Sequence, residues 1–496
     1  MVRLRPILME CEAMPTTAAD ASLIAELTEL LGEEGVIHRH DERVVFECDG
    51  YVIDKAMPDV VAFPTSTEQV AAVVKLCNRR GVPFVPRGAG TSLAAGTLLP
   101  EGGVMINLTR MNRVLEIDVR DRYAVVEPGL INVWLTEALA GTGLHYAPDP
   151  SSQVACTIGG NVATNAGGPH TLKYGVTTNH VRGVELVTTE GEVVWIGGLV
   201  ADQPGYDLAG LLVGHEGTFG VVTKIVVGLS RNPEAGRTLL AVFQTIDDSV
   251  SAVSDIVAAG IVPAAVEMID NLMIRAVEEA YHFGFPLDAE AVLIIEIDGI
   301  EAALDREARA ITEIVQARDG RIDRNIAWRT RKEPEYKSIW KSRKSAFGAI
   351  GRVSPTFCTQ DGVVPRTALP QILRYMGEAS KRYGLRIANV FHAGDGNIHP
   401  IILFDEKDAD QVKRALEASR DILAECIRLG GSVSGEHGIG AEKIAMMPLL
   451  FSPDDLAAMA ALHEALNPGG LCSPHKKIPM GGHCVEQVAP GRHAPA

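Results

Sequence analysis

The 496-residue sequence lacks clustered cysteines and long apolar runs. Its eight cysteines are scattered without a CxxC motif, which argues against disulfides, structural zinc and an iron–sulfur cluster in this chain. No window approaches the roughly 18 apolar residues of a membrane span. The stretch Pro6–Glu12 is too short for a signal peptide. We therefore expect a cytoplasmic protein, and any electron carrier of the iron–sulfur type would have to lie on another chain.

The sequence also lacks an excess of basic residues, since 46 Lys and Arg against 63 Asp and Glu give a net charge of −17. Such a surface repels nucleic acid and anionic lipid, so we expect neither as a direct partner. An anionic substrate then requires a local cationic pocket. Glycine, in contrast, is abundant, and its 49 residues concentrate in a few loops.

The order of apolar and turn-forming residues predicts four segments. We expect a helical lead-in over residues 1–50, a first domain over 51–230, an α+β domain over 231–472 and a tail over 473–496. The turn-forming run Ser230–Pro233 marks the boundary between the two domains.

Local patterns place individual helices and strands. Thr65 with Glu68 predicts a capping box at the start of a helix that Gly81 ends, and Val82–Val85 reads as the next strand. In the second domain, the spacing of apolar residues predicts a long helix over Asp410–Leu429.

Three separate segments are rich in glycine and small polar residues: Pro86–Ser92, Pro148–Gly168 and Gly214–Gly220. Backbone N–H groups and glycines without a Cβ allow a pyrophosphate to approach closely. Neither a Rossmann fingerprint nor a P-loop is present, because Leu93 stands where the third glycine would fall. The first loop taken alone is better explained as a tight turn, but three such loops predict one extended ligand.

The second half carries charged motifs. Two histidines and a glutamate occur in two separate loops, His392–His399 and Ser434–Gly438. Together they form a donor set that suits Zn²⁺, Mn²⁺ or Fe²⁺. Hydrogen-bonded loop histidines are the alternative. The run Trp340–Lys344 contains Arg343, whose guanidinium could bind a carboxylate in two contacts or lie on a solvated helix face.

The three glycine-rich loops resemble the FAD-binding domain of the vanillyl-alcohol-oxidase superfamily. The resemblance implies an α+β fold, with a two-subdomain FAD-binding domain of the PCMH type followed by an α+β substrate or cap domain. It departs at His215, where many relatives have serine. The residues that it places against FAD are Arg87, Gly88, Gly90, Thr91, Ser92, Pro148, Thr157, Gly160, Asn161, Thr164 and Glu216.

The charged motifs resemble the C-terminal domain of FAD-linked D-2-hydroxy-acid dehydrogenases, and the likeness covers about residues 55–485. It implies that His392, His399 and Glu436 hold a divalent metal. In the same way, His437 would accept the proton of the substrate hydroxyl, and Arg343 would bind the substrate carboxylate.

The motifs are especially similar to the glycolate-oxidising branch of this family. The implied reaction is oxidation of glycolate to glyoxylate by hydride transfer to flavin. The implied partners are a second flavin-domain subunit and an iron–sulfur subunit, which would give peripheral contact with the inner membrane.

Three other functions remain open. A D-lactate or D-2-hydroxyglutarate dehydrogenase that works without a complex would share the chemistry. A non-redox transferase of the alkylglycerone-phosphate-synthase type would keep only the FAD domain. A degenerate subunit would have no reason to keep the His392, His399, Glu436, His437 and Arg343 set.

Overall fold

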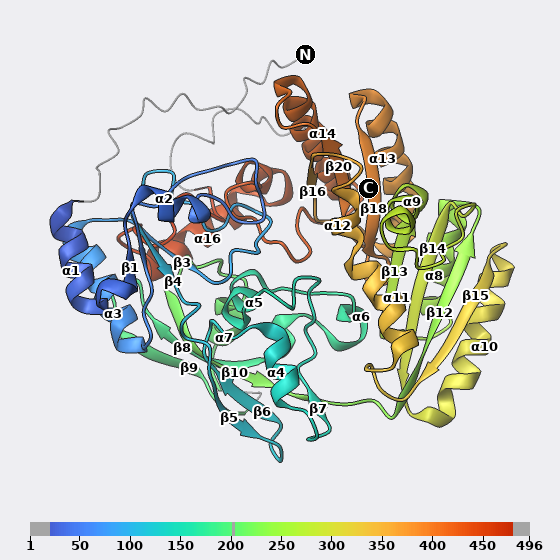
Figure 1. The fold of residues 1–496 in the computed structure, drawn as a ribbon, viewed down its shortest axis with the longest axis horizontal. Helices are drawn as coiled ribbons and strands as arrows, with labels where there is room; N and C mark the ends of the chain where they lie inside the picture. The colour runs from blue at the N-terminus through green and yellow to red at the C-terminus, as the bar shows by residue number, and fades with distance from the viewer. Residues whose placement is uncertain (1–19, 201–203, 480–496) are drawn as a thin grey trace.

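The computed structural model describes residues 20–200 and 204–479 (Figure 1). The expected beginning of the lead-in, the Pro6–Glu12 stretch and the end of the predicted tail lie outside these residues. The described chain forms two parts that stand side by side. The first part consists of residues 20–231 and 452–479, and the second part of residues 232–451.

The first part opens with a small sheet in the order β1-β2-β4-β3, in which β2, β4 and β3 are parallel. Its strands are β1 (Val36–Ile37), β2 (Val60–Ala62), β3 (Phe84–Arg87) and β4 (Val104–Asn107). Its helices are α1 (Ala21–Leu31), α2 (His40–Arg43) and α3 (Thr67–Arg80). Apolar residues of α1, α3 and the sheet share one core.

The predicted capping box at the start of α3 is wrong by one residue. The N-cap is Ser66, whose side chain accepts the amide of Gln69, and Thr65 bonds instead to the Gln69 side chain. Serine and threonine are both good N-caps, so the adjacent pair left the choice to backbone geometry. The predicted stop is confirmed, because Gly81 adopts a left-handed conformation with φ +62°.

A second sheet of the first part runs in the order β5-β6-β10-β8-β9, and β7 pairs with β11 beside it. The strands are β5 (Val114–Asp118), β6 (Tyr123–Val126), β7 (Leu144–His145), β8 (Val181–Val187), β9 (Val193–Gly197), β10 (Val221–Gly228) and β11 (Ser230–Arg231). Short helices fill the connections: α4 (Asn132–Ala138), α5 (Ile158–Thr164), α6 (Thr171–Tyr174) and α7 (Leu208–Leu212).

The second part is built on a large sheet in the order β15-β12-β14-β13-β18-β19-β17, with β20 pairing to β18 and β16. The strands are β12 (Ala235–Phe243), β13 (Ala265–Asp270), β14 (Ala291–Gly299), β15 (Arg321–Trp328), β16 (Thr356–Thr359), β17 (Gly362–Val363), β18 (Arg386–His392), β19 (Asn397–Ile398) and β20 (Pro400–Phe404).

Helices cover both faces of this sheet, so its central strands are apolar on both sides. One core contains residues of α8 (Ile246–Ala258), α10 (Glu301–Ala317), α13 (Leu369–Tyr383) and α14 (Ala409–Arg428). The opposite core contains residues of α9 (Asn271–Tyr281), α11 (Pro334–Lys344) and α12 (Ala346–Ile350). The observed α14 confirms the long helix predicted for this region.

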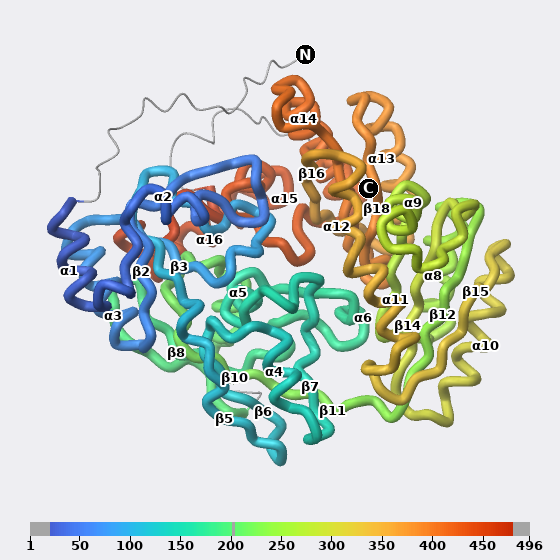
Figure 2. The backbone as a smooth tube through the Cα atoms, viewed as in Figure 1, coloured from blue at the N-terminus to red at the C-terminus, as the bar shows by residue number. Residues whose placement is uncertain are grey.

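After the short helix α15 (Met447–Leu450), the chain returns to the first part. There α16 (Pro453–Leu466) starts at a capping box between Ser452 and Asp455. Cys472 then forms a β-bridge with Phe84 in β3, so the last described segment lies beside the start of the fold (Figure 2). The α+β class is confirmed, whereas the predicted domain boundaries stay predictions. In the described ranges, no helix is long and apolar enough to cross a membrane.

Candidate functional site

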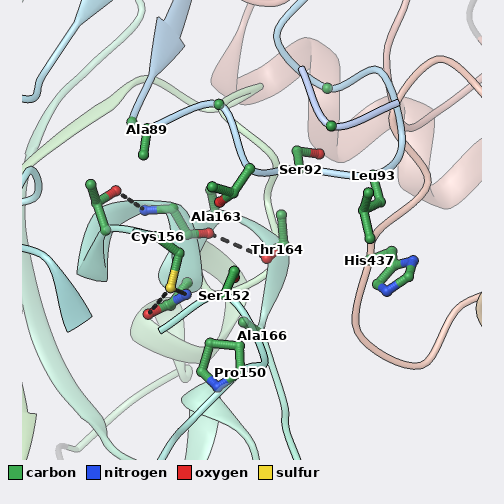
Figure 3. Close-up of a pocket in the computed structure, with 18 of the residues that line it drawn as sticks. Ala89, Ser92, Leu93, Pro150, Ser152, Cys156, Ala163, Thr164, Ala166 and His437 are labelled. Atoms are coloured by element: carbon green, nitrogen blue, oxygen red, sulfur yellow. Dashed lines mark hydrogen bonds between the residues drawn. The ribbon is translucent and has the colours of Figure 1, made fainter. Parts of the chain in front are cut away.

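A cavity of about 490 Å³ lies where the two parts meet. Its first-part wall includes residues of the three glycine-rich loops, which lie at the end of β3, around α5 and before β10. Figure 3 labels residues of the first two loops. Its second-part wall includes Lys344, His399, Glu436 and His437. The prediction of one extended ligand therefore corresponds to one continuous cavity.

The cavity wall contains nearly every residue predicted to contact FAD. Pro148 is the exception, since it is not in the wall and its carbonyl accepts a hydrogen bond from Asn132. The predicted residues found in the wall are Arg87, Gly88, Gly90, Thr91, Ser92, Thr157, Gly160, Asn161, Thr164 and Glu216.

Glycine is required at two positions of the first loop. A Cβ on Gly88 would lie 2.3 Å from the hydroxyl oxygen of Thr157, the N-cap of α5. Gly90 has φ +72°, and a Cβ there would collide with the Arg87 guanidinium. Arg87 itself bonds to Thr97 and to the Cys48 carbonyl, so it supports the loop from behind.

A hairpin brings the two predicted metal-binding histidines together. β18 ends at His392, and β19 returns antiparallel so that His392 pairs with Asn397. His399 follows directly, and the two imidazole centres are 5.1 Å apart. The turn between β18 and β19 therefore brings the two histidines together.

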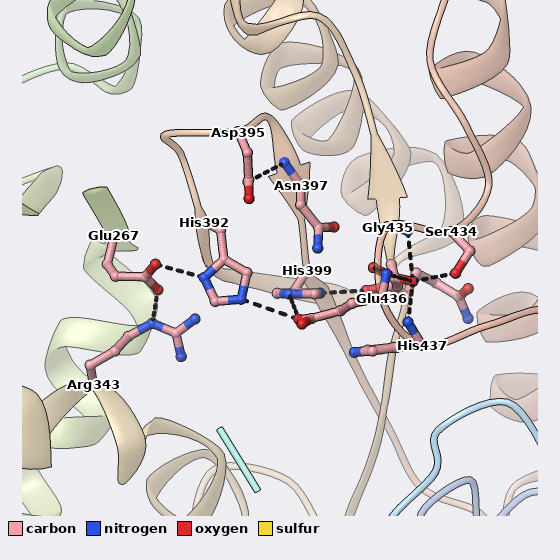
Figure 4. Close-up of polar contacts among 12 residues, drawn as sticks. Glu267, Arg343, His392, Asp395, Asn397, His399, Ser434, Gly435, Glu436 and His437 are labelled. Carbon is pink, nitrogen blue, oxygen red and sulfur yellow. Dashed lines mark hydrogen bonds and ion pairs between the residues drawn. The ribbon is translucent and has the colours of Figure 1, made fainter. Parts of the chain in front are cut away.

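Glu436 completes this cluster from a separate loop. Its Oε1 lies 3.2 Å from Nε2 of His392 and 3.1 Å from Nε2 of His399 (Figure 4). Burial raises the pKa of Glu436, but the two histidines outweigh this and hold the pKa well below its usual range. The three side chains offer donor atoms within 4.8 Å of one another.

Glu267 is the residue of this site that the sequence did not reveal. It lies on β13 directly opposite His392, and its Oε1 is 2.6 Å from Nδ1 of His392. Its Oε2 is 2.6 Å from Nε of Arg343, and both partners are almost fully buried. Burial raises the pKa of Glu267, but the charges of His392 and Arg343 outweigh it and lower the pKa.

Arg343 is not on a solvated face, since only 1% of its side chain is exposed. Its Nη1 and Nη2 are buried and have no hydrogen-bond partner among the described residues. Figure 4 shows the guanidinium on the side of Glu267 that faces the histidine cluster. Because unpaired buried guanidinium nitrogens are costly, this geometry favours an anionic ligand.

His437 lies beside the cluster and in the cavity wall. Its ring stacks on His399 at 5.0 Å with an interplanar angle of 7°. Burial lowers the pKa of His437 to about 4, so the imidazole is neutral near pH 7. Its Nδ1 lacks a partner within the described chain.

The cavity wall includes further side chains that no sequence motif indicated. Lys344 lines the cavity and forms no ion pair within the described ranges. Phe347, Phe357 and Thr359 extend the same wall. They come from α12 and β16, which only the fold brings to this place.

A second buried charge network joins the two parts away from the cavity. His170 lies between Asp149 at 2.9 Å and Glu296 at 3.2 Å, and Arg331 contacts Glu296 and Asp298 at 3.1 Å each. Burial alone would lower the pKa of His170, but Asp149 and Glu296 outweigh it and raise the pKa to about 9. Because Asp149 directly precedes cavity residues, this network also anchors the second glycine-rich loop.

The residues of the cavity and of the histidine cluster fit FAD and a divalent metal, which are the two groups that the sequence implied. A cavity of about 490 Å³ is within the usual range for cofactor pockets, and its small side chains expose backbone to a ligand. Two imidazole nitrogens and one carboxylate oxygen form a donor set suited to a divalent transition metal.

Comparison with known proteins identifies the class. Residues 58–197 match the family described as FAD binding domain, and residues 232–477 match the family of FAD linked oxidases, C-terminal domain. The chain therefore belongs to the FAD-linked oxidase family, and it is an FAD-dependent oxidoreductase. This confirms the FAD cofactor.

Individual relatives match over nearly the whole chain. The chain is 43% identical to glycolate oxidase subunit GlcD of Escherichia coli over 474 residues, covering 96% of this chain and 94% of the relative. It is 32% identical to a D-lactate dehydrogenase of Anaerostipes hadrus, covering 88% and 91%. Among solved structures, p-cresol methylhydroxylase matches with a TM-score of 0.78 at 18% identity, covering 93% and 97%, which supports the fold alone.

Proposed function

We propose that this chain oxidises a short 2-hydroxy acid to the 2-oxo acid, with glycolate as the first substrate to test. The observation that carries the proposal is the proximity of three features at, or directly next to, the second-part wall. These are a neutral histidine, a metal-type donor set and a guanidinium with two unpaired nitrogens. A hydroxycarboxylate presents the matching groups, which are a hydroxyl and a carboxylate.

Each side chain has a separate role in this proposal. The Nη1 and Nη2 atoms of Arg343 bind the two carboxylate oxygens, while Glu267 holds the guanidinium through Nε. The Nε2 atom of His437 accepts the hydroxyl proton. These residues fix the orientation of the substrate and stabilise its developing negative charge.

The cofactors supply what side chains cannot. FAD, when bound, accepts the hydride from the substrate α-carbon. A divalent metal held by His392, His399 and Glu436 would lower the pKa of the substrate hydroxyl. Zn²⁺, Mn²⁺ and Fe²⁺ all suit these ligands.

The assembly is also part of the proposal. The 43% identity to a protein named as an oxidase subunit supports a role within a complex. We propose a second flavin-domain subunit and an iron–sulfur subunit as electron acceptors, with peripheral membrane contact through these partners.

Anaerobic reduction of the flavin tests the proposal. Purified FAD-loaded protein is mixed separately with glycolate, D-lactate, L-lactate and D-2-hydroxyglutarate, and absorbance is followed at about 450 nm, where oxidised flavin absorbs. We expect glycolate to bleach the flavin.

The D-lactate dehydrogenase relative makes a larger substrate the second candidate. Bleaching only by a larger D-hydroxy acid would keep the mechanism and change the substrate. A flavin that none of the four compounds reduces would refute the hydroxy-acid function for this chain.

A further inference from the structure

The loop Ser434–Gly440 presents Glu436 and His437 to the cavity, and it has no regular secondary structure. Its backbone amides are nevertheless all paired from Gly435 to Gly440. None of these amides bonds to a backbone carbonyl of a neighbouring strand. Side-chain oxygens of Asp361, Ser434 and Glu216 accept every one of them.

Asp361 holds the first half of this loop from within the second part. Its Oδ2 accepts the amides of Gly435 at 3.0 Å, Glu436 at 3.1 Å and His437 at 2.8 Å. The same oxygen accepts the hydroxyl of Ser434 at 2.7 Å. Asp361 is fully buried, and Lys443 lies 3.7 Å away as its counter-charge.

Glu216 holds the second half of the loop from the first part. Its Oε1 accepts the amide of Ile439 at 3.0 Å, and its Oε2 accepts the amide of Gly440 at 2.6 Å. The carboxylate of Glu216 is therefore occupied by backbone donors of the second part. Its backbone, in contrast, belongs to the Gly214–Gly220 loop that lines the flavin cavity.

The docking of the two loops leaves no room for larger residues. A Cβ on Gly438 would lie 3.0 Å from the Glu216 carboxylate, and Gly438 has φ +85°. A Cβ on Gly440 would lie 1.7 Å from the carbonyl oxygen of Ala94, in the first-part segment after the first glycine-rich loop. The loop is thus seated against two segments of the first part.

We propose that Asp361 and Glu216 are positioning residues that hold the Ser434–Gly440 loop from its two sides, and that Glu216 couples this loop to the flavin-binding wall. The roles of Glu436 and His437 rest on the proposed function above, but the coupling itself does not. In this proposal the carboxylate of Glu216 acts through the loop rather than through a contact with the flavin.

Hydrogen–deuterium exchange of the FAD-loaded full chain tests the coupling directly. Peptides that cover residues 434–441 are compared in the wild type, Glu216→Gln and Asp361→Asn. A glutamine cannot accept two amides with both terminal atoms, so we expect exchange at Ile439 and Gly440 to accelerate roughly tenfold or more in Glu216→Gln. Asp361→Asn should accelerate exchange at Gly435 to His437 in the same way.

Two control variants match these changes. Glu185→Gln alters a hydrogen-bonded glutamate of the first part that contacts Thr67, Thr223 and Lys224. Asp270→Asn alters a buried aspartate that accepts amides of Met273 and Asn389 away from the loop. Both controls should leave exchange at residues 434–441 unchanged.

FAD content and flavin reduction are measured on the same samples. Glu216→Gln should keep its FAD and lose roughly tenfold or more in the rate of flavin reduction, with a smaller change in substrate affinity. Unchanged loop exchange in Glu216→Gln would overturn the coupling. Loss of FAD with unchanged loop exchange would instead make Glu216 a flavin ligand and would also overturn it.

The coupling can still be tested if Asp361→Asn does not fold, because the comparison of Glu216→Gln with the wild type is sufficient. It is also separable from the proposed function. Faster loop exchange in a protein whose flavin no hydroxy acid reduces would support the positioning role while refuting the hydroxy-acid function.

Discussion

The two walls of the cavity use different chemistry. The first-part wall is rich in glycines and small residues, which expose backbone to a ligand. The second-part wall carries His399, Glu436, His437 and Lys344, and Arg343 lies just behind the histidines. The difference supports the proposal that the first wall holds the cofactor and the second transforms the substrate, because shape is needed to hold a cofactor and titratable groups are needed for the reaction.

This comparison predicts that variants of the two walls lose different properties. Changes in the first wall should alter FAD affinity, and changes in the second should alter substrate binding or the rate of flavin reduction. Glu216 is the exception in the first wall, because its carboxylate bonds to the Ser434–Gly440 loop of the second part. A variant that crossed this division would break the comparison.

The largest expected effect is that of His437→Ala. Loss of the proton acceptor should lower the rate of anaerobic flavin reduction by about 10²- to 10⁴-fold, while FAD content stays at the wild-type level. Stopped-flow absorbance measures the rate. The control is His463→Ala, a buried histidine of α16 that also has an unpaired Nδ1 in the described chain. An unchanged rate in His437→Ala would exclude this residue as the base.

Arg343→Lys tests the proposed binding of the substrate carboxylate beside the second wall. Lysine keeps the charge but lacks the planar guanidinium that can donate two parallel hydrogen bonds to a carboxylate. The substrate Kd from flavin-reduction titrations should therefore rise by about 10²-fold. Arg331→Lys is the matched control, because Arg331 also pairs with a buried glutamate but lies in the network between the parts. Equal losses in both variants would show that Arg343 acts through general stability.

Gly88→Ala tests the first wall. The added Cβ would lie 2.3 Å from the Thr157 hydroxyl oxygen, and moving the loop should raise the Kd for FAD by roughly 10- to 100-fold. The rate of reduction at saturating FAD should change much less. Gly377→Ala, where a Cβ meets nothing within 4 Å, should leave FAD affinity unchanged. Fluorescence titration of the apoprotein with FAD measures both.

The last prediction concerns the His170 network between the two parts, and its effect is on stability and not on activity. His170 has a pKa of about 9 in the folded state, against about 6.5 in an unfolded chain. A raised pKa means that its stabilisation is complete below about pH 6.5 and is lost as the pH rises through the folded value. The maximum contribution is about 3 kcal/mol. Thermal unfolding at several pH values should show this loss in the wild type and not in His170→Gln.

The first wall was the easier wall to predict from sequence. Runs such as Gly88–Ser92 and Thr157–Gly168 are poor for packing, so their composition alone indicated a ligand. All the predicted flavin residues except Pro148 lie in the cavity wall, although their contacts with FAD stay predictions. The alternating strands and helices also made the α+β fold predictable.

The second wall was harder because its parts are distant in the sequence. Glu267 lies 125 residues before His392, and only the pairing of β13 with β18 brings them together. Its one sequence signal is a charged residue with apolar neighbours on both sides in a strand. Asp361 gave no signal, since its role depends on the backbone path of a loop more than 70 residues later.

A deuterium isotope effect on flavin reduction tests the central claim most directly. FAD-loaded protein is mixed anaerobically with glycolate or with glycolate deuterated at the α-carbon, and the rate of flavin bleaching is compared. Transfer of a hydride from that carbon predicts clearly slower bleaching with the deuterated substrate. Bleaching at the same rate with both, while the rate still depends on His437, would show that cleavage of the C–H bond does not limit reduction and would contradict the account. No bleaching with either would remove glycolate as the substrate.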